Sequence, residues 1–275
     1  MNILVTGGAG FIGSHLAEKL AKQGHRIWIL DDFNDYYDPR VKECNVAVLP
    51  SSVTIVRGDI RNAALCRKLG EECRFDAIYH LAARAGVRPS LEQPALYTEV
   101  NCLGTVNVLE AARVSGCRKF IFASSSSVYG NLTHTPFSES DDVSFPISPY
   151  AATKKAGELL CYNYHHLYGL PVACLRFFTV YGPRQRPDMA IHKFTRMIAE
   201  GRPLTRYGDG GTSRDYTYVD DIVAGCLALL DHDFGYEILN LGNSHAVPLS
   251  RLIGLIEEAV GRRAVIQESG VPPGE

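Results

Sequence analysis

Three glycines near the N-terminus constrain the fold of this 275-residue chain more than any other feature. Gly7, Gly10 and Gly13 follow a short apolar run, residues 2–6, and open an amphipathic helical pattern. Glycines at this spacing allow a tight turn, a close approach of the backbone to a pyrophosphate, and close packing of helix on strand. The helix N-terminus then offers N–H groups and the positive end of its dipole to phosphates. The pattern therefore predicts a dinucleotide-binding unit of strand, turn and helix.

Apolar segments typical of strands alternate with helical segments along the next 170 or so residues. This alternation predicts a parallel sheet built from βαβ units. Because the strands are almost continuously apolar, we expect helices on both faces of the sheet. The predicted fold class is α/β, a Rossmann-type doubly wound parallel sheet. The predicted strands are 2–6, 26–30, 53–56, 77–80, 119–123 and 172–177, and the predicted helices include 62–72, 95–115 and 149–168.

The pattern loosens after about Tyr181, where prolines and glycines separate shorter elements from a last helix near 249–260. We expect residues 1–180 to form the dinucleotide-binding domain and residues 181–275 a smaller C-terminal substrate-binding lobe. The boundary is approximate and the two lobes are expected to interleave. The sequence ends in Pro-Pro-Gly-Glu, a loop composition, so we expect a further C-terminal piece to be absent.

Composition excludes several classes of function. The chain is 46% hydrophobic and 21% charged, as in soluble globular proteins. Its net charge of −2 leaves no basic excess for nucleic acid or an anionic membrane, and no apolar run is long enough to cross a bilayer. The eight cysteines show no CxxC spacing, which favours reduced thiols in a cytoplasmic protein. The histidines show no metal-ligand spacing, so we expect no metal.

Acidic residues after the second and third predicted strands are candidates for the adenosine end of the dinucleotide. Asp31 would accept hydrogen bonds from the ribose diol and would repel a 2′-phosphate, which favours NAD over NADP. Asp32 adds to that charge, unless it is only a solvated loop carboxylate. Asp59 could reach the adenine amino group, or it could cap the helix that follows.

Tyr150 and Lys154 lie four residues apart in a predicted helix and therefore share one helix face. An ammonium beside a tyrosine stabilises the phenolate and lowers its pKa, which produces a general base usable near neutral pH. Four serines, 124–127, follow a predicted strand at the end where ligands of such sheets bind. A hydroxyl there, with Ser125 as the candidate, could bond the substrate oxygen that loses its proton, or the serines could only cap the strand end.

These motifs together resemble the extended short-chain dehydrogenase/reductase family, in its nucleotide-sugar epimerase and dehydratase branch. The resemblance rests on 6–13, 81–83, Asn101, the serine run with Val128-Tyr129-Gly130, and Tyr150-xxx-Lys154. It implies a homodimer formed through two helices, near 95–115 and 149–168. It implies tightly bound NAD, held by Gly7, Gly10, Phe11, Ile12, Gly13, Asp31, Asp32, Asp59, Ile60, Leu81, Ala82, Ala83, Asn101, Tyr150 and Lys154.

Two short motifs separate the chemistries within this branch. The 4,6-dehydratases carry Thr-Asp-Glu where this chain has Ser125-Ser126-Ser127, and the UDP-glucuronate decarboxylases carry a Glu at the place of Ser127. Both activities are therefore disfavoured. The UDP-galactose 4-epimerases typically carry Asn in place of Thr179, whereas the runs 85–90 and 186–189 resemble the UDP-glucuronate 4-epimerases.

A uronate substrate adds a carboxylate that needs an arginine or several hydroxyls. Arg186 is the candidate arginine and Arg184 its competitor, and either could instead form a surface salt bridge. The resemblance implies that Arg214 contacts the diphosphate and that Tyr207 stacks on uracil, unless Tyr207 packs in the core. The expected substrate-binding residues are Arg88, Ser125, Ser126, Ser127, Thr179, Arg186, Tyr207 and Arg214.

The sequence thus predicts an NAD-dependent 4-epimerase that interconverts UDP-glucuronate and UDP-galacturonate. Tyr150 takes the C4 hydroxyl proton as hydride leaves C4 for NAD, Ser125 bonds the C4 oxygen, and Lys154 holds the ribose. The 4-keto sugar then rotates and receives the hydride on its other face. The alternatives are a UDP-glucose/UDP-galactose 4-epimerase, a UDP-glucuronate decarboxylase, and a non-catalytic dinucleotide sensor.

Overall fold

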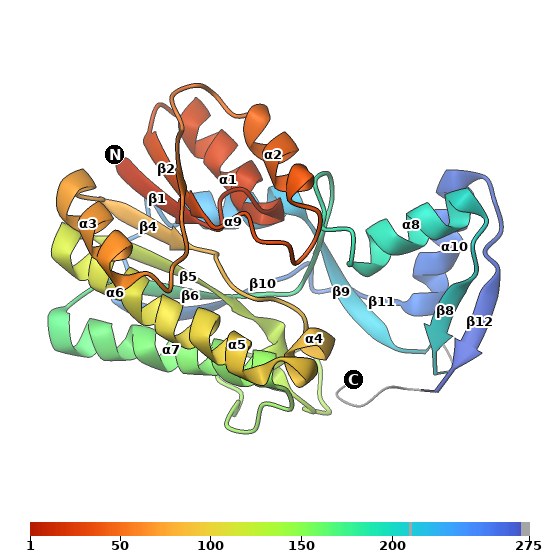
Figure 1. The fold of residues 1–275 in the computed structure, drawn as a ribbon. Helices are drawn as coiled ribbons and strands as arrows, with labels where there is room; N and C mark the ends of the chain where they lie inside the picture. The colour runs from red at the N-terminus through yellow and green to blue at the C-terminus, as the bar shows by residue number, and fades with distance from the viewer. Residues whose placement is uncertain (209–210, 271–275) are drawn as a thin grey trace.

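The computed structural model describes residues 1–208 and 211–270 of the chain. A seven-stranded sheet in the order β10-β6-β5-β4-β1-β2-β3 forms the centre of the larger lobe (Figure 1). Every pair of neighbouring strands in this sheet is parallel, which confirms the predicted fold class. The strands are β1 (Asn2–Thr6), β2 (Arg26–Asp31), β3 (Thr54–Arg57), β4 (Ala77–His80), β5 (Lys119–Ser125), β6 (Val172–Phe177) and β10 (Tyr236–Leu241).

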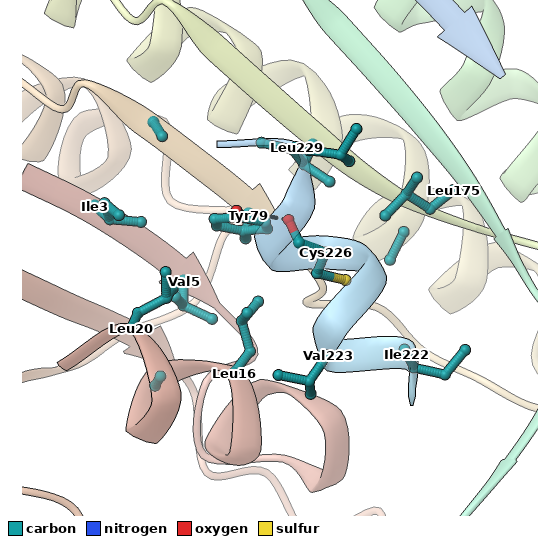
Figure 2. Packing of buried hydrophobic residues seen from close by; sticks show 14 of the residues in the cluster. Ile3, Val5, Leu16, Leu20, Tyr79, Leu175, Ile222, Val223, Cys226 and Leu229 are labelled. Atoms are coloured by element: carbon teal, nitrogen blue, oxygen red, sulfur yellow. Dashed lines mark hydrogen bonds between the residues drawn. The ribbon is translucent and has the colours of Figure 1, made fainter. Parts of the chain in front are cut away.

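Helices cover both faces of this sheet, because successive residues of its strands point to opposite sides. Ile3 and Val5 of β1 pack into one core with α1 (Phe11–Lys22) and α9 (Val219–Ala228) (Figure 2). Leu4, between them, packs into a second core. That second core is covered by α3 (Ala63–Cys73), α6 (Gly104–Ser115) and α7 (Pro149–Tyr168).

The predicted helix over 95–115 is confirmed as helical backbone, and the structure divides it into three consecutive parts. α5 (Pro94–Thr98) is followed by a π-helical turn, η1 (Glu99–Leu103), and then by α6. Asn101 of this turn bonds backbone groups of Arg84 and the hydroxyl of Thr153. A π turn inserts one extra residue, and such turns are frequent at functional sites. Here the irregular turn carries Asn101, whose side chain bonds two other segments of the chain.

The later part of the chain forms a smaller lobe, beside the large sheet in Figure 1. It contains a three-stranded sheet, a two-stranded sheet and a small core between two helices. α9 and β10 also follow Tyr181 but belong to the larger lobe; the boundary at 180/181 stays a prediction. The small-lobe elements are β7 (Thr179–Tyr181), α8 (Ala190–Glu200), β8 (Leu204–Tyr207), β9 (Ser213–Tyr218), β11 (Ala246–Pro248), α10 (Leu249–Val260) and β12 (Ile266–Ser269).

Three short helices complete the described part of the chain: α2 (Pro39–Ala47), α4 (Val87–Glu92) and the 3-10 turn η2 (Ser126–Tyr129). None of the described helices has the length and apolar character needed to cross a bilayer. All eight cysteines are free thiols, and five of them are buried.

The glycine-rich turn between β1 and α1 is packed too tightly for side chains. Gly7 has a φ of 69°, and a Cβ atom there would lie 2.7 Å from the backbone nitrogen of Ala82. A Cβ atom at Gly13 would lie 2.3 Å from the carbonyl oxygen of Gly7. Because both obstacles are backbone atoms, the backbone of the turn or of the segment after β4 would have to move to admit either substitution.

We expect Gly13→Ala to lower the free energy of unfolding by about 2 kcal/mol, since the steric clash outweighs the better helix propensity of alanine. The matched control is Gly254→Ala, also inside a helix, where a Cβ atom would meet nothing within 4 Å. This control should raise the free energy of unfolding by about 0.5–1 kcal/mol. Urea unfolding measures both, and two changes of the same sign would contradict the packing described for the turn.

Candidate active site

A cavity opens at the carboxyl ends of β1, β2, β4 and β5 and extends along the first turns of α7. This is the edge of an open parallel sheet at which ligands bind. The cavity brings together most of the residues singled out from the sequence, although their roles stay predictions. Those that line it are Gly7, Gly10, Phe11, Ile12, Gly13, Asp31, Asp32, Asp59, Ile60, Leu81, Ala82, Ala83, Ser125, Tyr150, Lys154 and Arg186.

Asp31, at the end of β2, is 4% exposed and already well supplied with hydrogen bonds. It accepts them from the backbone N–H groups of Ala9 (3.2 Å) and Phe33 (3.0 Å) and from Lys42 Nζ (2.8 Å). The same ammonium lies 3.6 Å from Asp32. The charge argument from sequence counted the two carboxylates as unopposed, but Lys42 offsets one of them. No local sequence signal identifies Lys42, because it reaches Asp31 from α2 only once the chain has folded.

Asp59 lines the cavity and does not cap the next helix. Its side chain accepts bonds from the backbone N–H (2.8 Å) and the guanidinium Nε (2.9 Å) of Arg61. Although burial opposes the change, these bonds hold the pKa of Asp59 below its ordinary value. The residue that caps α3 is Asn62, whose Oδ1 accepts from the N–H of Leu65 at 3.1 Å. The capping alternative for Asp59 is therefore wrong.

Helix α7 positions Tyr150 and Lys154 because its start is defined by the local sequence. The hydroxyl of Ser148 accepts a hydrogen bond from the N–H of Ala151 at 3.1 Å, and Pro149 occupies the first helical position. Tyr150 then lies in the first turn, and Lys154 follows on the same helix face. Both side chains line the cavity, beside Ser125 at the end of β5.

The electrostatics of this pair differ from the sequence-based expectation. Burial lowers the pKa of Lys154 to about 8, and its Nζ donates to the carbonyl of Ala123 at 2.7 Å. Burial raises the pKa of Tyr150, and the opposing influences are a hydrogen bond with Ser125 and the charge of Arg186. The prediction that Lys154 lowers the Tyr150 pKa is wrong for this arrangement. The ammonium instead bonds the Ala123 carbonyl and lies 5.9 Å from the centre of the tyrosine ring.

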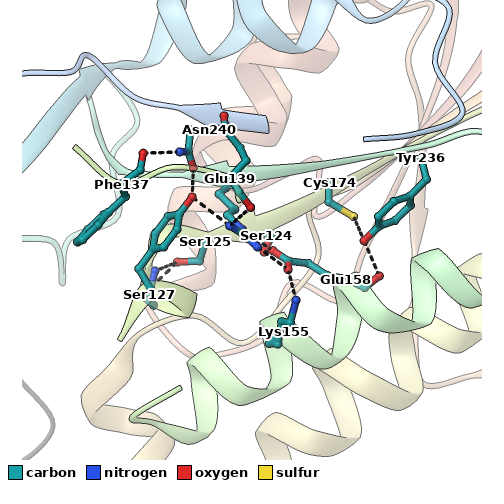
Figure 3. Close-up of polar contacts among 12 residues, drawn as sticks. Ser124, Ser125, Ser127, Phe137, Glu139, Lys155, Glu158, Cys174, Tyr236 and Asn240 are labelled. Carbon is teal, nitrogen blue, oxygen red and sulfur yellow. Dashed lines mark hydrogen bonds and ion pairs between the residues drawn. The ribbon is translucent and has the colours of Figure 1, made fainter. Parts of the chain in front are cut away.

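The four serines take different positions, and Figure 3 shows Ser124, Ser125 and Ser127. Ser124 lines the cavity, but its hydroxyl donates to the buried carboxylate of Glu158 at 2.7 Å. Ser125 accepts from the N–H of Ser127 at 3.1 Å, which caps η2, and it also lines the cavity. Capping and lining are therefore compatible at Ser125. Ser126 and Ser127 are half-buried and lie outside the cavity lining.

Asn101 lies behind the cavity wall rather than in it. It is 2% exposed, and its amide is fully used. Oδ1 accepts from the N–H of Arg84 (2.8 Å), while Nδ2 donates to the carbonyl of Arg84 and to the hydroxyl of Thr153 (both 3.0 Å). In this structure Asn101 therefore joins the segment after β4 to the first turn of α7, and the direct cofactor contact stays a prediction.

The structure separates the two competing arginines. Arg186 lines the cavity, where its guanidinium pairs with Asp188 at 2.7 Å. Arg184 points away to α1, where it pairs with Glu18 at 2.6 Å. This difference could not be foreseen from the sequence, because the two residues are separated only by Gln185.

The remaining predicted substrate residues lie outside the cavity lining. The guanidinium of Arg88 lies 4.4 Å from the ring centre of Tyr207, which places a residue of α4 against a residue of β8. Arg214 is exposed on β9, and Thr179 is half-buried at the start of β7. The structure thus places these four residues between the two lobes or on the small lobe, without showing what they bind.

Two tyrosines that the sequence analysis missed, Tyr36 and Tyr37, line the cavity from the segment after β2. The Tyr36 hydroxyl donates to the carbonyl of Ala85 at 2.9 Å. The guanidinium groups of Arg84 and Arg186 lie 5.7 Å and 5.4 Å from the centre of the Tyr36 ring. An adjacent pair of aromatic residues shortly after Asp31 was the available signal.

Comparison with known proteins gives a matching family and several similar proteins. Residues 3–242 match the family described as the NAD dependent epimerase/dehydratase family. UDP-glucuronate 4-epimerase 3 of Arabidopsis thaliana is 45% identical over 281 residues, 96% of this chain, which spans only 65% of the plant protein. A UDP-glucuronate 4-epimerase of Thermodesulfobacterium geofontis is 44% identical over 95% of this chain and 81% of that protein.

A solved structure is similar over the whole chain. The UDP-glucuronic acid 4-epimerase of Bacillus cereus, in complex with UDP-glucuronic acid and NAD, superposes with a TM-score of 0.93. It is 39% identical, and the match covers 100% of this chain and 88% of that one.

The burial of Lys154 has a measurable cost. Because its pKa is about 8 in the folded chain and higher in the unfolded chain, the folded state is penalised wherever Lys154 is protonated. Lys154→Met should therefore raise the free energy of unfolding at pH 7 by about 2 kcal/mol, after allowing for the lost bond to Ala123. The gain should shrink above pH 8 and vanish near the ordinary lysine pKa of about 10.4. Urea unfolding at several pH values tests this, and a gain that does not depend on pH would contradict it.

Proposed function

The chain belongs to the NAD dependent epimerase/dehydratase family, and on that premise we propose that it is an NAD-dependent 4-epimerase of a UDP-uronic acid, interconverting UDP-glucuronate and UDP-galacturonate. The observation that carries the proposal is a single cavity lined by Tyr150, Lys154, Ser125 and Arg186. The first three residues suit proton transfer at a sugar hydroxyl, and the fourth suits a carboxylate. The names of the two UDP-glucuronate 4-epimerases and the bacterial complex described above support the choice of sugar.

The cavity fits NAD on its own geometry. Gly7 and Gly10 have no side chains, so a ligand can approach the backbone of this turn. The first turn of α1, at Phe11 to Gly13, holds no acidic residue. A pyrophosphate at this helix N-terminus would meet free N–H groups. Asp31 would bind the adenosine ribose and Asp59 the adenine. When bound, NAD supplies a reversible hydride acceptor for C4 of the sugar and a positive charge beside Tyr150.

The residues of the chain then have defined tasks. Tyr150 accepts the proton of the C4 hydroxyl and returns it after the 4-keto sugar has turned its other face. Ser125 holds the C4 oxygen and, because it lowers the pKa of Tyr150, favours the phenolate. Lys154, which is mainly protonated at neutral pH with a pKa of about 8, holds the ribose of the cofactor. No net oxidation occurs, so the cofactor need not leave.

The substrate carboxylate makes the 4-keto intermediate prone to lose carbon dioxide, because it is then a β-keto acid. An epimerase must hold that carboxylate away from the alignment that favours decarboxylation. Arg186, which lines the cavity, is proposed to hold it, and Ser126, Ser127 and Thr179 are proposed to assist when substrate is bound. Arg184 is unsuited, since it is paired with Glu18 on α1.

We also propose a cytoplasmic homodimer. Leu159 and Tyr162 on α7 are 58% and 49% exposed, and Leu103 beside α6 is 51% exposed. Large apolar side chains on neighbouring helices favour burial by a second copy. Eight free thiols favour a reducing compartment. The proposed partners are a UDP-sugar and a second copy of the chain, not nucleic acid or a membrane.

Proton NMR of the purified protein with UDP-glucuronate and catalytic NAD tests the function. Growth of UDP-galacturonate signals is the expected result. UDP-xylose, or its 4-keto precursor, would instead show decarboxylation and overturn the interpretation of Ser127. Turnover of UDP-glucose with no reaction of UDP-glucuronate would assign the chain to the neutral-sugar epimerases, and no turnover of either would favour the sensor.

Arg186→Ala should weaken binding of UDP-glucuronate by about 10- to 100-fold, since a charge-assisted hydrogen bond is lost, without weakening NAD binding. Arg184→Ala is the matched control, because it removes an arginine two residues away whose partner lies on α1. Isothermal titration of both variants gives the comparison. Equal affinities for UDP-glucuronate in Arg186→Ala and Arg184→Ala would refute the assignment.

A further inference from the structure

We propose that Glu158 and Arg176 are positioning residues for the reaction proposed above. Their ion pair holds α7 and the end of β5 in the register that brings Ser125 to Tyr150. The two side chains are 0% and 1% exposed, and their Oε1 and Nε atoms lie 2.9 Å apart. Neither residue lines the cavity. The inference rests on the proposed function for its meaning but on separate contacts for its support.

The first line of support is the face of α7 on which Glu158 lies. Tyr150, Lys154 and Glu158 are four residues apart, so they share one helix face. Each of them faces a different one of three consecutive residues, 123–125, at the end of β5. Glu158 Oε1 accepts from Ser124 at 2.7 Å and Lys154 donates to Ala123 at 2.7 Å, while Tyr150 lines the cavity beside Ser125, whose hydroxyl lowers the Tyr150 pKa. The buried pair therefore fixes the contact between α7 and β5 at a point next to the candidate site.

The second line of support is how completely the carboxylate of Glu158 is bonded (Figure 3). Oε1 accepts from Ser124 and from Arg176 Nε, while Oε2 accepts from Arg176 Nη2 at 3.1 Å and from Lys155 Nζ at 3.2 Å. A carboxylate that accepts four hydrogen bonds, two of them from one arginine, has one favoured orientation. Since α7 supplies Glu158, this orientation limits both sliding and rotation of the helix against β5 and β6.

The third line of support is the other arm of Arg176. Its Nη1 donates to the Tyr129 hydroxyl at 3.0 Å, and that hydroxyl donates to Oδ1 of Asn240 on β10 at 2.7 Å. Tyr129 ends the 3-10 turn η2, which begins at Ser126. The ion pair therefore holds the serine run at both ends, through Ser124, its first member, and through Tyr129, which follows it. Ser125 lies between these two attachments.

This arrangement predicts more than a stabilising role. A buried ion pair is weak evidence for stability, because apolar side chains of similar volume often serve as well. Directional bonds are needed where a hydroxyl and a phenol must meet at a defined distance. Loss of the attachment should therefore move Ser125 relative to Tyr150 and reduce the influence by which Ser125 lowers the Tyr150 pKa.

Tyr129→Phe tests the proposal with the least disturbance, because it removes one hydroxyl and buries no charge. The matched control is Tyr79→Phe, which removes the bond from a buried tyrosine of β4 to the Cys226 carbonyl (2.9 Å) on α9, at the other face of the sheet (Figure 2). For both variants, kcat per NAD-loaded site, KM for UDP-glucuronate and the melting temperature are measured. The Tyr150 pKa is taken from phenolate absorbance, by difference from Tyr150→Phe.

We expect Tyr129→Phe to lower kcat about tenfold with little change in KM, as a small misplacement of reacting groups does. Its Tyr150 pKa should rise, so the acidic limb of the kcat profile should move to higher pH. Tyr79→Phe should lower only the melting temperature. Glu158→Gln should show the Tyr129→Phe effects more strongly. Arg176→Lys keeps the positive charge but loses the two-point contact with Glu158, so it should also lower kcat.

The proposal is overturned if Tyr129→Phe lowers the melting temperature while its kcat per loaded site and Tyr150 pKa match those of Tyr79→Phe. Should Glu158→Gln fail to fold, Tyr129→Phe still decides the matter. Should the unmodified protein not turn over UDP-glucuronate, the proposed function fails. The Tyr150 titration would then decide the positioning role by itself, since it requires no substrate.

Discussion

Helix α7 lies so close to β5 that a Cβ atom at Gly157 would come within 2.3 Å of Cζ of Phe122. This contact brings one helix face, carrying Tyr150 and Lys154, to the strand end that carries Ser125. The start of α7 is defined by the Ser148 cap and Pro149, and its depth is defined by Gly157. The candidate chemistry depends on both, because proton transfer requires the donor and acceptor within hydrogen-bond reach.

Several charged side chains lie along the contact between α7 and β5 and in the cavity beside it. Behind the cavity, the buried charge of Glu158 is offset by Arg176. At the cavity, burial lowers the pKa of Lys154 to about 8 and raises the pKa of Tyr150. In front, Arg186 opposes the rise at Tyr150, so the same arginine proposed to meet a carboxylate also favours the phenolate. Occupation of Arg186 by a uronate would therefore couple substrate charge to the strength of the base.

The parts of the structure that repeat with a period were predictable from the sequence. Apolar strands and amphipathic helices predicted the parallel sheet and its two covered faces, and α7 begins and ends where expected. The predicted helix 95–115 is helical throughout, but its π-helical turn η1 was not foreseen, and there Asn101 takes polar partners from two distant segments. The contacts of Lys42, Arg184 and Glu158 could not be predicted from the sequence either. Their partners, Asp31, Glu18 and Ser124, come from other elements, and no pattern along the chain encodes such pairings.

The most direct test of the central claim is the fate of the hydrogen on C4 of the sugar. UDP-glucuronate carrying deuterium at C4 is incubated with the NAD-loaded protein in ordinary water, and the product is analysed by NMR and mass spectrometry. We expect UDP-galacturonate that keeps its deuterium at C4, because the hydrogen leaves and returns within one closed site while Tyr150 handles only the hydroxyl proton. Loss of the deuterium to water, or exchange at C5 instead, would contradict it.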